Sequence, residues 1–307
     1  MRVVFMGSPE FAVPALERLL AQHDVVLVVT QPDKPAGRGK KLTPPPVKRV
    51  AQQAGVDVYQ PTSARAPEFV DRLRAAAPDV CVVVAYGKIL PRPVLDVAPL
   101  GCVNIHASLL PKYRGAAPIQ WAILRGETVT GVTIMQLDEG MDTGPILLTR
   151  EVPIAPDDTA GSLHDKLAPI GADLLVEALD GLAAGTIEPR PQDDASATYA
   201  PMLTKADGQV DWRRSAREVR DRVRGVDPWP GAFTLVDGAP LKLYGARLAS
   251  GAGAPGEVLA AEGDGLRVAC GDGAVTIAEV QAPGRRRMPA AAFATGRRLT
   301  PGMVLGT

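Results

Sequence analysis

The chain has 307 residues, of which 46% are hydrophobic and 22% are charged, and its formal net charge at pH 7 is zero. This composition excludes fibrous and disordered proteins, and the length is sufficient for two domains of ordinary size. No apolar run approaches the roughly 20 residues that a transmembrane helix needs. We therefore expect no association with a membrane.

The three cysteines, Cys81, Cys102 and Cys270, are widely spaced and form no CxxC motif. Two of them lie in apolar, strand-like runs, which predicts buried thiols in a reducing compartment. No cluster of His and Cys has the spacing of a zinc site. The N-terminus lacks the pattern of a signal peptide. We expect a cytoplasmic protein that binds no metal.

The first half of the chain alternates apolar runs with helical patterns. Runs typical of strands lie at residues 2–6, 25–30, 80–85, 101–107 and 131–137, and a further, antiparallel strand is predicted at 146–154. Helical spacing is found at 47–54, 63–77, 116–124 and 159–182. This order predicts an α/β fold with a doubly wound, mostly parallel, Rossmann-like sheet.

The alternation of strands and helices stops after residue 182. Residues 185–196 have the Pro, Asp and Ser content of a linker. From residue 233 onward, short strand-like runs are separated by Gly-rich turns, which is typical of a small β-barrel or sandwich. The sequence thus predicts an N-terminal domain (1–184), a linker (185–204) and a C-terminal β-barrel domain (205–307).

Asn104, His106 and Asp142 form the strongest candidate catalytic set. Asn104 and His106 are two residues apart on a predicted strand, so their side chains share one face. Acyl transfer needs a donor for the developing oxyanion, a proton carrier and a group that orients the carrier, which an amide, an imidazole and a carboxylate supply. Asp142 follows the next strand in a Gly-flanked turn and would reach His106 in a parallel sheet. The alternative is that His106 is a core histidine and that Asp142 only shapes its turn.

Two loops would border this site. Residues 108–111 (SLLP) form one wall and residues 86–91 form another, and together they suit a planar heterocycle. Ordinary loop hydrophobes are the alternative. A dinucleotide is a poor candidate because the turn at Gly7 lacks the GxGxxG pattern.

Basic residues cluster in three places. The loop at 31–46 (QPDKPAGRGKKLTPPP) is long for a connection and carries Lys34, Arg38, Lys40 and Lys41, and further clusters lie at 285–287 and 297–298. Each cluster is either solvated or contacts phosphates. Residues 205–307 also hold 15 Lys and Arg against 11 Asp and Glu, so the C-terminal part is mildly basic. Together these features favour a nucleic-acid partner.

The chain resembles the methionyl-tRNA formyltransferase family over its whole length. The resembling segments are MGSPEFAVPALERLL, QPDKPAGRGKKLTPPPVK, VVVAYGKILP, VNIHASLLPKYRGAAPIQWAI, GVTIMQLDEGMDTGPIL and the later DPWP. The N-x-H…SLLP…D-x-G-x-D-x-G set resembles formyltransferases that use 10-formyltetrahydrofolate, and the PAGRGKK loop and the C-terminal barrel resemble the tRNA enzyme.

The resemblance implies a formyltransferase-type catalytic domain and an OB-like C-terminal barrel that binds tRNA. It implies transfer of the formyl group of 10-formyltetrahydrofolate to the α-amino group of methionine on initiator methionyl-tRNA, by a monomer without a metal. The catalytic residues would be Asn104, His106 and Asp142, and Asp142 would also hold the tautomer of His106. The folate would contact Ser108, Leu109, Leu110 and Pro111, with Ile89 and Leu90 near its pterin ring, and the tRNA would contact Arg38, Lys40 and Lys41.

Three alternatives remain at this stage. The formyl acceptor could be glycinamide ribonucleotide or a sugar amine. Water could replace the amine, so that the donor is hydrolysed. The chain could also be a non-catalytic RNA-binding module on an α/β scaffold.

Overall fold

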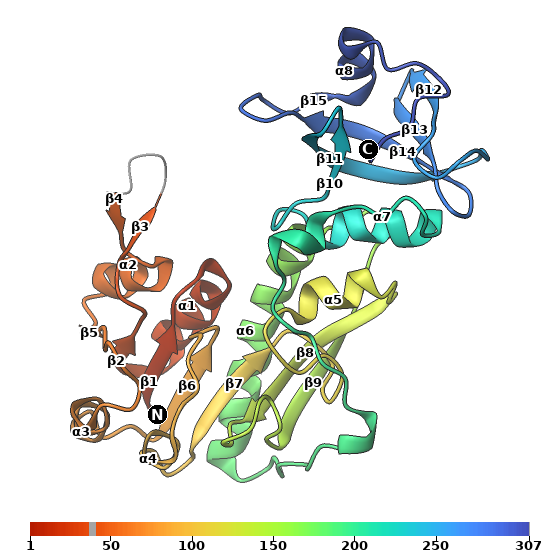
Figure 1. Cartoon of the computed structure of the whole chain (residues 1–307). Coiled ribbons are helices and arrows are strands. Elements are labelled where there is room, and N and C mark those ends of the chain that lie inside the picture. Colours follow the sequence, from red (N-terminus) through yellow and green to blue (C-terminus); the bar gives the residue numbers. More distant parts are fainter. Residues whose placement is uncertain (37–40, 307) are drawn as a thin grey trace. The chain divides into compact units, whose positions relative to one another are not determined.

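The structure is a computed structural model that describes residues 1–36 and 41–306 (Figure 1). The chain folds into two compact units that interleave along the sequence. Unit 1 comprises Met1–Gly115, Gly131–Val152 and His164–Tyr199, and unit 2 comprises Ala116–Thr130, Pro153–Leu163 and Ala200–Thr307. The predicted linker, 185–204, is therefore divided between the two units, at Tyr199 and Ala200.

Unit 1 is built on a seven-stranded sheet with the order β5-β2-β1-β6-β7-β8-β9. The strands are β1 (Arg2–Gly7), β2 (Asp24–Val29), β5 (Val58–Tyr59), β6 (Val80–Val84), β7 (Cys102–His106), β8 (Val129–Gln136) and β9 (Ile146–Pro153). The pairs β1–β2, β2–β5, β1–β6 and β6–β7 are parallel. The chain winds outward from β1 in both directions, which confirms the predicted doubly wound, mostly parallel sheet.

The direction of β8 differs from the expectation. β8 runs antiparallel to β7, with Val103 opposite Gln136 and His106 opposite Thr133. We expected a parallel pair, in which Asp142 would reach the end of the His106 strand, and this expectation was wrong. A run of buried apolar residues does not encode the direction in which its strand runs.

The helices between β1 and residue 184 are α1 (Val13–Gln22), α2 (Pro46–Gln53), α3 (Pro67–Ala75), α4 (Arg92–Leu95), α5 (Pro118–Leu124), which belongs to unit 2, and α6 (Ala160–Ala184). Phe69 and Leu73 of α3 and Leu95 of α4 join residues of β1, β2 and β6 in one apolar core. Helix α6 lies close to β7 and β8: a Cβ atom on Gly171 would be 2.9 Å from Ile105 Cγ2. Ile105 therefore faces α6, and its neighbours on β7 face the other side of the sheet.

The basic loop after β2 contains a short hairpin. Its strands β3 (Lys34–Ala36) and β4 (Lys41–Thr43) pair antiparallel, with Lys34 opposite Thr43. At its base, Lys48 Nζ donates to both oxygens of Asp33 at 2.8 and 2.9 Å, and this bond with the lysine lowers the pKa of Asp33 below its usual value. An ion pair thus joins Asp33, the residue before β3, to helix α2, which follows β4.

Unit 2 contains a curled antiparallel sheet with the order β10-β11-β14-β13-β12, to which β15 adds beside β14 (Figure 1). Its elements are α7 (Ala216–Gly225), β10 (Phe233–Val236), β11 (Ala239–Ala249), β12 (Val258–Glu262), β13 (Gly265–Ala269), β14 (Ala274–Gln281), β15 (Met288–Pro289) and α8 (Ala290–Arg297). Leu243, Val268 and Ile277 of the sheet pack with Val223 of α7 and Phe293 of α8. This is the predicted OB-like C-terminal domain.

Among the helices of the described ranges, none is long and apolar enough to cross a membrane.

Candidate active site

Asn104 and His106 lie on β7 and point away from α6. Their residues are 9% and 5% exposed, and Ile105 between them faces the opposite side. The Asn104 amide forms no hydrogen bond within the described part of the chain, which leaves both its N–H groups available to a ligand. The sequence prediction that these two side chains share a face follows from the two-residue period of a strand.

Both ring nitrogens of His106 face an oxygen atom. Nε2 lies 2.9 Å from the carbonyl oxygen of Tyr113, and Nδ1 lies 3.7 Å from Oδ1 of Asp142. Because a carbonyl can only accept, Nε2 carries a proton, and the lone pair of the neutral ring is on Nδ1. We expected Asp142 to hold the tautomer of His106, whereas here the Tyr113 carbonyl holds it.

Asp142 belongs to the turn between β8 and β9. Its backbone is left-handed, with φ of 55°. Its Oδ2 accepts a hydrogen bond from the Gly115 N–H at 2.8 Å, and its Oδ1 faces His106. A side chain at Gly144 would meet the Gln136 carbonyl oxygen, so the turn packs against the end of β8. The carboxylate is thereby held toward the imidazole from one side.

The distance between Nδ1 and Oδ1 decides what this pair can do. At 3.7 Å it is too long for a direct hydrogen bond, but it is short enough for the carboxylate to stabilise a charge on the ring. Nδ1 is the nitrogen that remains able to exchange a proton with a ligand, directly or through one water. The unbonded amide of Asn104 and the imidazole of His106 therefore lie on one face of β7, with the Asp142 carboxylate beside the imidazole.

The comparisons with known proteins agree with this chemistry. The "Formyl transferase" family model matches residues 1–179, and the "Formyl transferase, C-terminal domain" model matches residues 202–298. Proteins named methionyl-tRNA formyltransferase from Citrifermentans bemidjiense and Geobacter sulfurreducens are each 52% identical to this chain over 307 residues. The matches cover all of this chain and 96% and 97% of those proteins.

The chain belongs to the methionyl-tRNA formyltransferase family.

Solved structures share the fold of this formyltransferase at lower identity. HypX from Aquifex aeolicus, in complex with tetrahydrofolic acid, matches 96% of this chain with a TM-score of 0.64 and 21% identity. The match covers 47% of HypX, so this chain spans about half of that protein. WlaRD, a sugar 3N-formyl transferase solved with dTDP and 5-N-formyl-THF, matches 93% of this chain and 99% of its own, with a TM-score of 0.69 and 18% identity.

The predicted folate residues of the formyltransferase fall into two classes. Ser108 is fully buried, and its hydroxyl donates to the Lys112 carbonyl at 2.7 Å. Leu110 is 6% exposed and packs against Met135 and Ile146, and Leu109 lies against Gly131 of β8. This loop, which ends at Pro111, can therefore offer mainly its backbone to a ligand. The two residues predicted to lie near the pterin ring differ in exposure. Ile89 is 73% exposed, whereas Leu90 belongs to the apolar core.

Tyr86, the first residue of the predicted 86–91 loop, is a core residue rather than a proton donor. Its ring is 2% exposed, and its hydroxyl has no hydrogen-bond partner in the described ranges. Burial raises the pKa of Tyr86 to about 12. The loop at 86–91 can thus contribute apolar surface and backbone groups, but no titratable group from Tyr86.

The predicted tRNA contacts are only in part within the described structure. Lys41 lies exposed on β4 of the hairpin. Arg38 and Lys40 lie outside the described residues.

Several site residues of the formyltransferase could not be found from sequence. Thr133 of β8 is fully buried, donates to the Ser108 carbonyl at 2.7 Å and accepts from the Leu110 N–H at 3.1 Å. Tyr113 contacts His106 through its backbone carbonyl, and because every residue has a carbonyl, the sequence cannot predict this contact. Arg114 is buried in the structure and lies in a segment that resembles the family. Only its charge in an apolar region could have distinguished it in the sequence.

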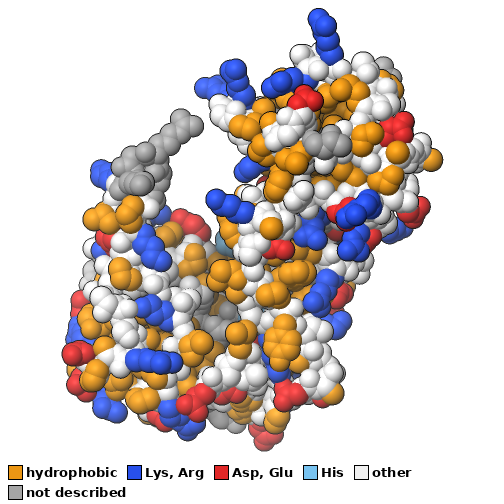
Figure 2. Space-filling model, viewed as in Figure 1, with side chains coloured by type: hydrophobic (Ala, Val, Ile, Leu, Met, Phe, Trp, Pro, Cys, Tyr) orange, Lys and Arg blue, Asp and Glu red, His pale blue; other side chains and the backbone are white. Residues whose placement is uncertain are grey.

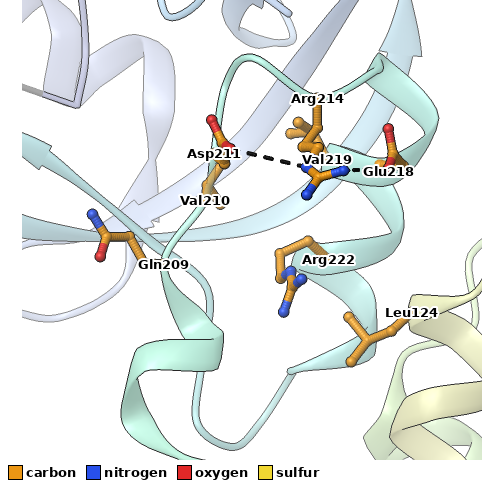
Figure 3. A pocket seen from close by; sticks show the side chains of 8 residues that line it. All are labelled: Leu124, Gln209, Val210, Asp211, Arg214, Glu218, Val219 and Arg222. Carbon is orange, nitrogen blue, oxygen red and sulfur yellow. Dashed lines mark ion pairs between the residues drawn. The ribbon is translucent and has the colours of Figure 1, made fainter.

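Two surface cavities lie in unit 2 and include none of the candidate catalytic residues. One has a volume of about 280 Å³ and is shown in Figure 3. In its lining, Arg214 lies 3.9 Å from Asp211 and 3.6 Å from Glu218, and Arg222 donates to the Asp207 carbonyl at 2.8 Å. The other, of about 570 Å³, is lined partly by Trp212 and Leu305. Within the described residues there is also no group of three or more His, Cys, Asp or Glu side chains that could hold a metal ion.

Proposed function

We propose that the protein transfers the formyl group of 10-formyltetrahydrofolate to the α-amino group of methionine on initiator methionyl-tRNA. The product, N-formylmethionyl-tRNA, would serve translation initiation in the cytoplasm. The observation that carries the proposal is the 52% identity over the full chain to proteins named for this activity, the C-terminal domain included. The proximity of Asn104, His106 and Asp142 supports it independently.

The amine substrate needs little activation. A free α-amino group has a pKa near ~7.7, so a large fraction is neutral at cellular pH and can attack a formyl carbon without a strong base. The Asn104 N–H groups and the protonated His106 would stabilise the oxyanion that develops on the formyl oxygen. Cys102, also on β7, is buried in the apolar core with its Sγ near the Val94 and Leu95 carbonyl oxygens, so it is not placed to attack a substrate. We therefore propose direct attack by the amine.

Proton delivery falls to His106. In its charged form both nitrogens carry protons, Nε2 donates to the Tyr113 carbonyl, and Nδ1 would give its proton to the donor nitrogen as the bond between that nitrogen and the formyl carbon breaks. The attacking amine loses one proton as it forms its own bond to the formyl carbon, and this proton would return to Nδ1 and recharge the ring. The Asp142 carboxylate at 3.7 Å stabilises the charged ring until Nδ1 gives its proton to the donor nitrogen. Asn104, His106 and Asp142 are thus the proposed catalytic residues.

The folate would lie against the 108–111 loop. We propose contacts with Ser108, Leu109, Leu110 and Pro111, with Ile89 and Leu90 near the pterin. Because the leucine side chains pack into the protein, the loop backbone would provide the polar contacts of this wall. The exposed Ile89 would cover the other side.

We further propose that residues 1–184 carry catalysis, that 205–307 bind the tRNA, and that 185–204 join the two in a monomer. Arg38, Lys40 and Lys41 would contact RNA phosphates. Figure 2 shows Lys and Arg side chains gathered over the turn between β14 and β15. There Arg287 stacks on Tyr244 at 4.1 Å, beside the exposed Arg285 and Arg286, an arrangement suited to an RNA backbone.

The test is a comparison of formyl acceptors with one purified enzyme. Methionyl-tRNA, free methionine, glycinamide ribonucleotide and an amino sugar nucleotide are each supplied with 10-formyltetrahydrofolate, and donor loss without acceptor is measured in parallel. We expect methionyl-tRNA to exceed the other acceptors in kcat/KM by several orders of magnitude. A preference for a small amine, or donor loss independent of acceptor, would replace the proposed substrate.

A further inference from the structure

Residues 190–198 run along the two loops that carry the site, although their composition is that of a linker. Arg190 and Ile146 exchange two backbone hydrogen bonds of 2.8 Å, next to the turn that contains Asp142. Farther on, the Thr198 carbonyl accepts from the Arg114 N–H at 2.8 Å. This segment therefore bridges the loop of Tyr113 and the turn of Asp142, and all three segments belong to unit 1.

Gln192 makes the bridge with its side chain. Its Nε2 donates to the carbonyl of Asp142 at 2.8 Å and to that of Gly144 at 2.7 Å. Its Oε1 accepts from Nε and Nη2 of Arg114 at 3.0 and 2.9 Å. Both donors and the acceptor of the amide are in use, so its orientation is determined from both ends.

Arg114 in turn is held in place. Its side chain is 3% exposed, and its Nη2 also pairs with Asp194 Oδ1 at 2.7 Å. The next residue, Gly115, donates its N–H to the Asp142 carboxylate. The same loop therefore contacts the carboxylate of Asp142 directly and its backbone through Gln192.

Asp142 needs such support because its backbone is left-handed, a conformation that non-glycine residues rarely adopt without surrounding constraints. Gln192 draws two carbonyls of the turn, one on each side of Thr143, toward a single amide. Without these bonds, the turn would lose the contacts that aim Oδ1 at His106.

We propose that Gln192 is a positioning residue for formyl transfer, which holds the Asp142 turn so that the carboxylate faces Nδ1 of His106. This inference rests on the proposed function for its kinetic readout. Gln192 thus supports catalysis from a segment whose composition is that of a linker.

The test is Gln192→Glu. The variant keeps an acceptor for Arg114 but loses both donors to the turn, and its carboxylate faces the two carbonyls. We expect kcat to fall by about 10- to 100-fold, because small displacements of a reacting geometry have effects of this size, and KM for donor and tRNA to stay within twofold. If Gln192→Glu folds poorly, the uncharged and nearly isosteric Gln192→Met takes its place with the same expected outcomes.

Two further measurements separate positioning from a general structural role. Added to Asp142→Asn, Gln192→Glu should cause less than a twofold further loss, because both changes act through one carboxylate. Asp193→Asn, at an exposed position in the same segment, serves as the matched control and should leave kcat unchanged. Losses that multiply in the double variant, or a wild-type kcat in Gln192→Glu, would overturn the inference.

A crystal structure of Gln192→Glu gives a readout that does not depend on the substrate. We expect the separation of His106 Nδ1 and Asp142 Oδ1 to exceed its wild-type value, and an unchanged separation would refute the role. If wild-type enzyme fails to formylate methionyl-tRNA, the proposed function fails, and the crystal structure still decides the role of Gln192.

Discussion

At the scale of single residues, the chemistry depends on which atoms face His106. The Tyr113 carbonyl fixes the proton on Nε2, and this leaves Nδ1, which faces Asp142, as the nitrogen that can exchange a proton. Charge on the ring is then stabilised across 3.7 Å without a direct bond that would compete for the proton. The imidazole can therefore act as a proton donor while its orientation stays fixed.

His106→Ala and Asp142→Asn should each lower kcat for formyl transfer by at least ~10²-fold, a typical cost of losing a general acid or its charge partner. Asp142→Asn keeps an oxygen for the Gly115 N–H, so it removes the charge while sparing the turn. Rapid-quench kinetics with methionyl-tRNA measures both effects. Asp138→Asn, in the same turn but bonded to Thr143, is the control. Near-wild-type kcat in either site variant would rule out its assigned role.

The sequence predicts Asn104, His106 and Asp142 as candidate catalytic residues, but it does not predict which atoms face His106. The two-residue spacing of Asn104 and His106 predicts a common face, because a strand alternates its side chains. The role of Tyr113 could not be predicted, since a backbone carbonyl is present at every position. Gln192 lies 50 residues beyond Asp142 in a polar segment, and no local pattern connects the two.

At the scale of elements, β8 supports the loop that follows β7. Thr133 lies opposite His106 in the register, and its hydroxyl joins the Ser108 carbonyl to the Leu110 N–H. One buried hydroxyl thus fixes the backbone of the proposed folate wall. The run at 131–137 was predicted as a strand from its apolar residues, but its antiparallel direction, which places Thr133 here, was not.

Thr133→Val should destabilise the protein by about 1–3 kcal/mol, because two buried backbone groups lose their partner while the volume is conserved. If the loop contacts folate, KM for the donor should also rise, with a smaller change in KM for tRNA. Urea unfolding and steady-state kinetics measure the two effects. Thr149→Val, exposed on the neighbouring β9, is the control and should stay within ~0.5 kcal/mol of wild type. Unchanged stability would mean that this hydroxyl does not hold the loop.

At the scale of the whole molecule, the order of elements was predictable and the assignment of segments to units was not. The alternation of apolar strands and amphipathic helices predicts a doubly wound sheet, and regular Gly-rich turns predict the C-terminal antiparallel sheet. However, α5 and residues 153–163 belong with the C-terminal domain, because Trp121 and Leu124 of α5 pack on its core. Such long-range packing leaves no mark in a local pattern.

The proposed RNA contacts predict a dependence of tRNA affinity on salt. Each phosphate neutralised by the protein contributes about −0.7 to −0.9 to the slope of log K against log salt concentration. Arg38→Ala should weaken binding and reduce the magnitude of this slope by about 1. Arg65→Ala, an exposed change outside the hairpin, should alter neither. An unchanged slope and affinity in Arg38→Ala would mean that the loop is solvated rather than bound to a phosphate.

The central claim is that one site, formed by Asn104, His106 and Asp142, moves a formyl group onto methionine carried by tRNA. A single-turnover experiment with formyl-labelled 10-formyltetrahydrofolate and methionyl-tRNA tests it most directly, with the label followed in tRNA, in remaining donor and in free formate. The account predicts that the label passes to the aminoacyl-tRNA at the rate of donor loss. Bound tRNA and donor with no label transferred, or label released as formate, would contradict it.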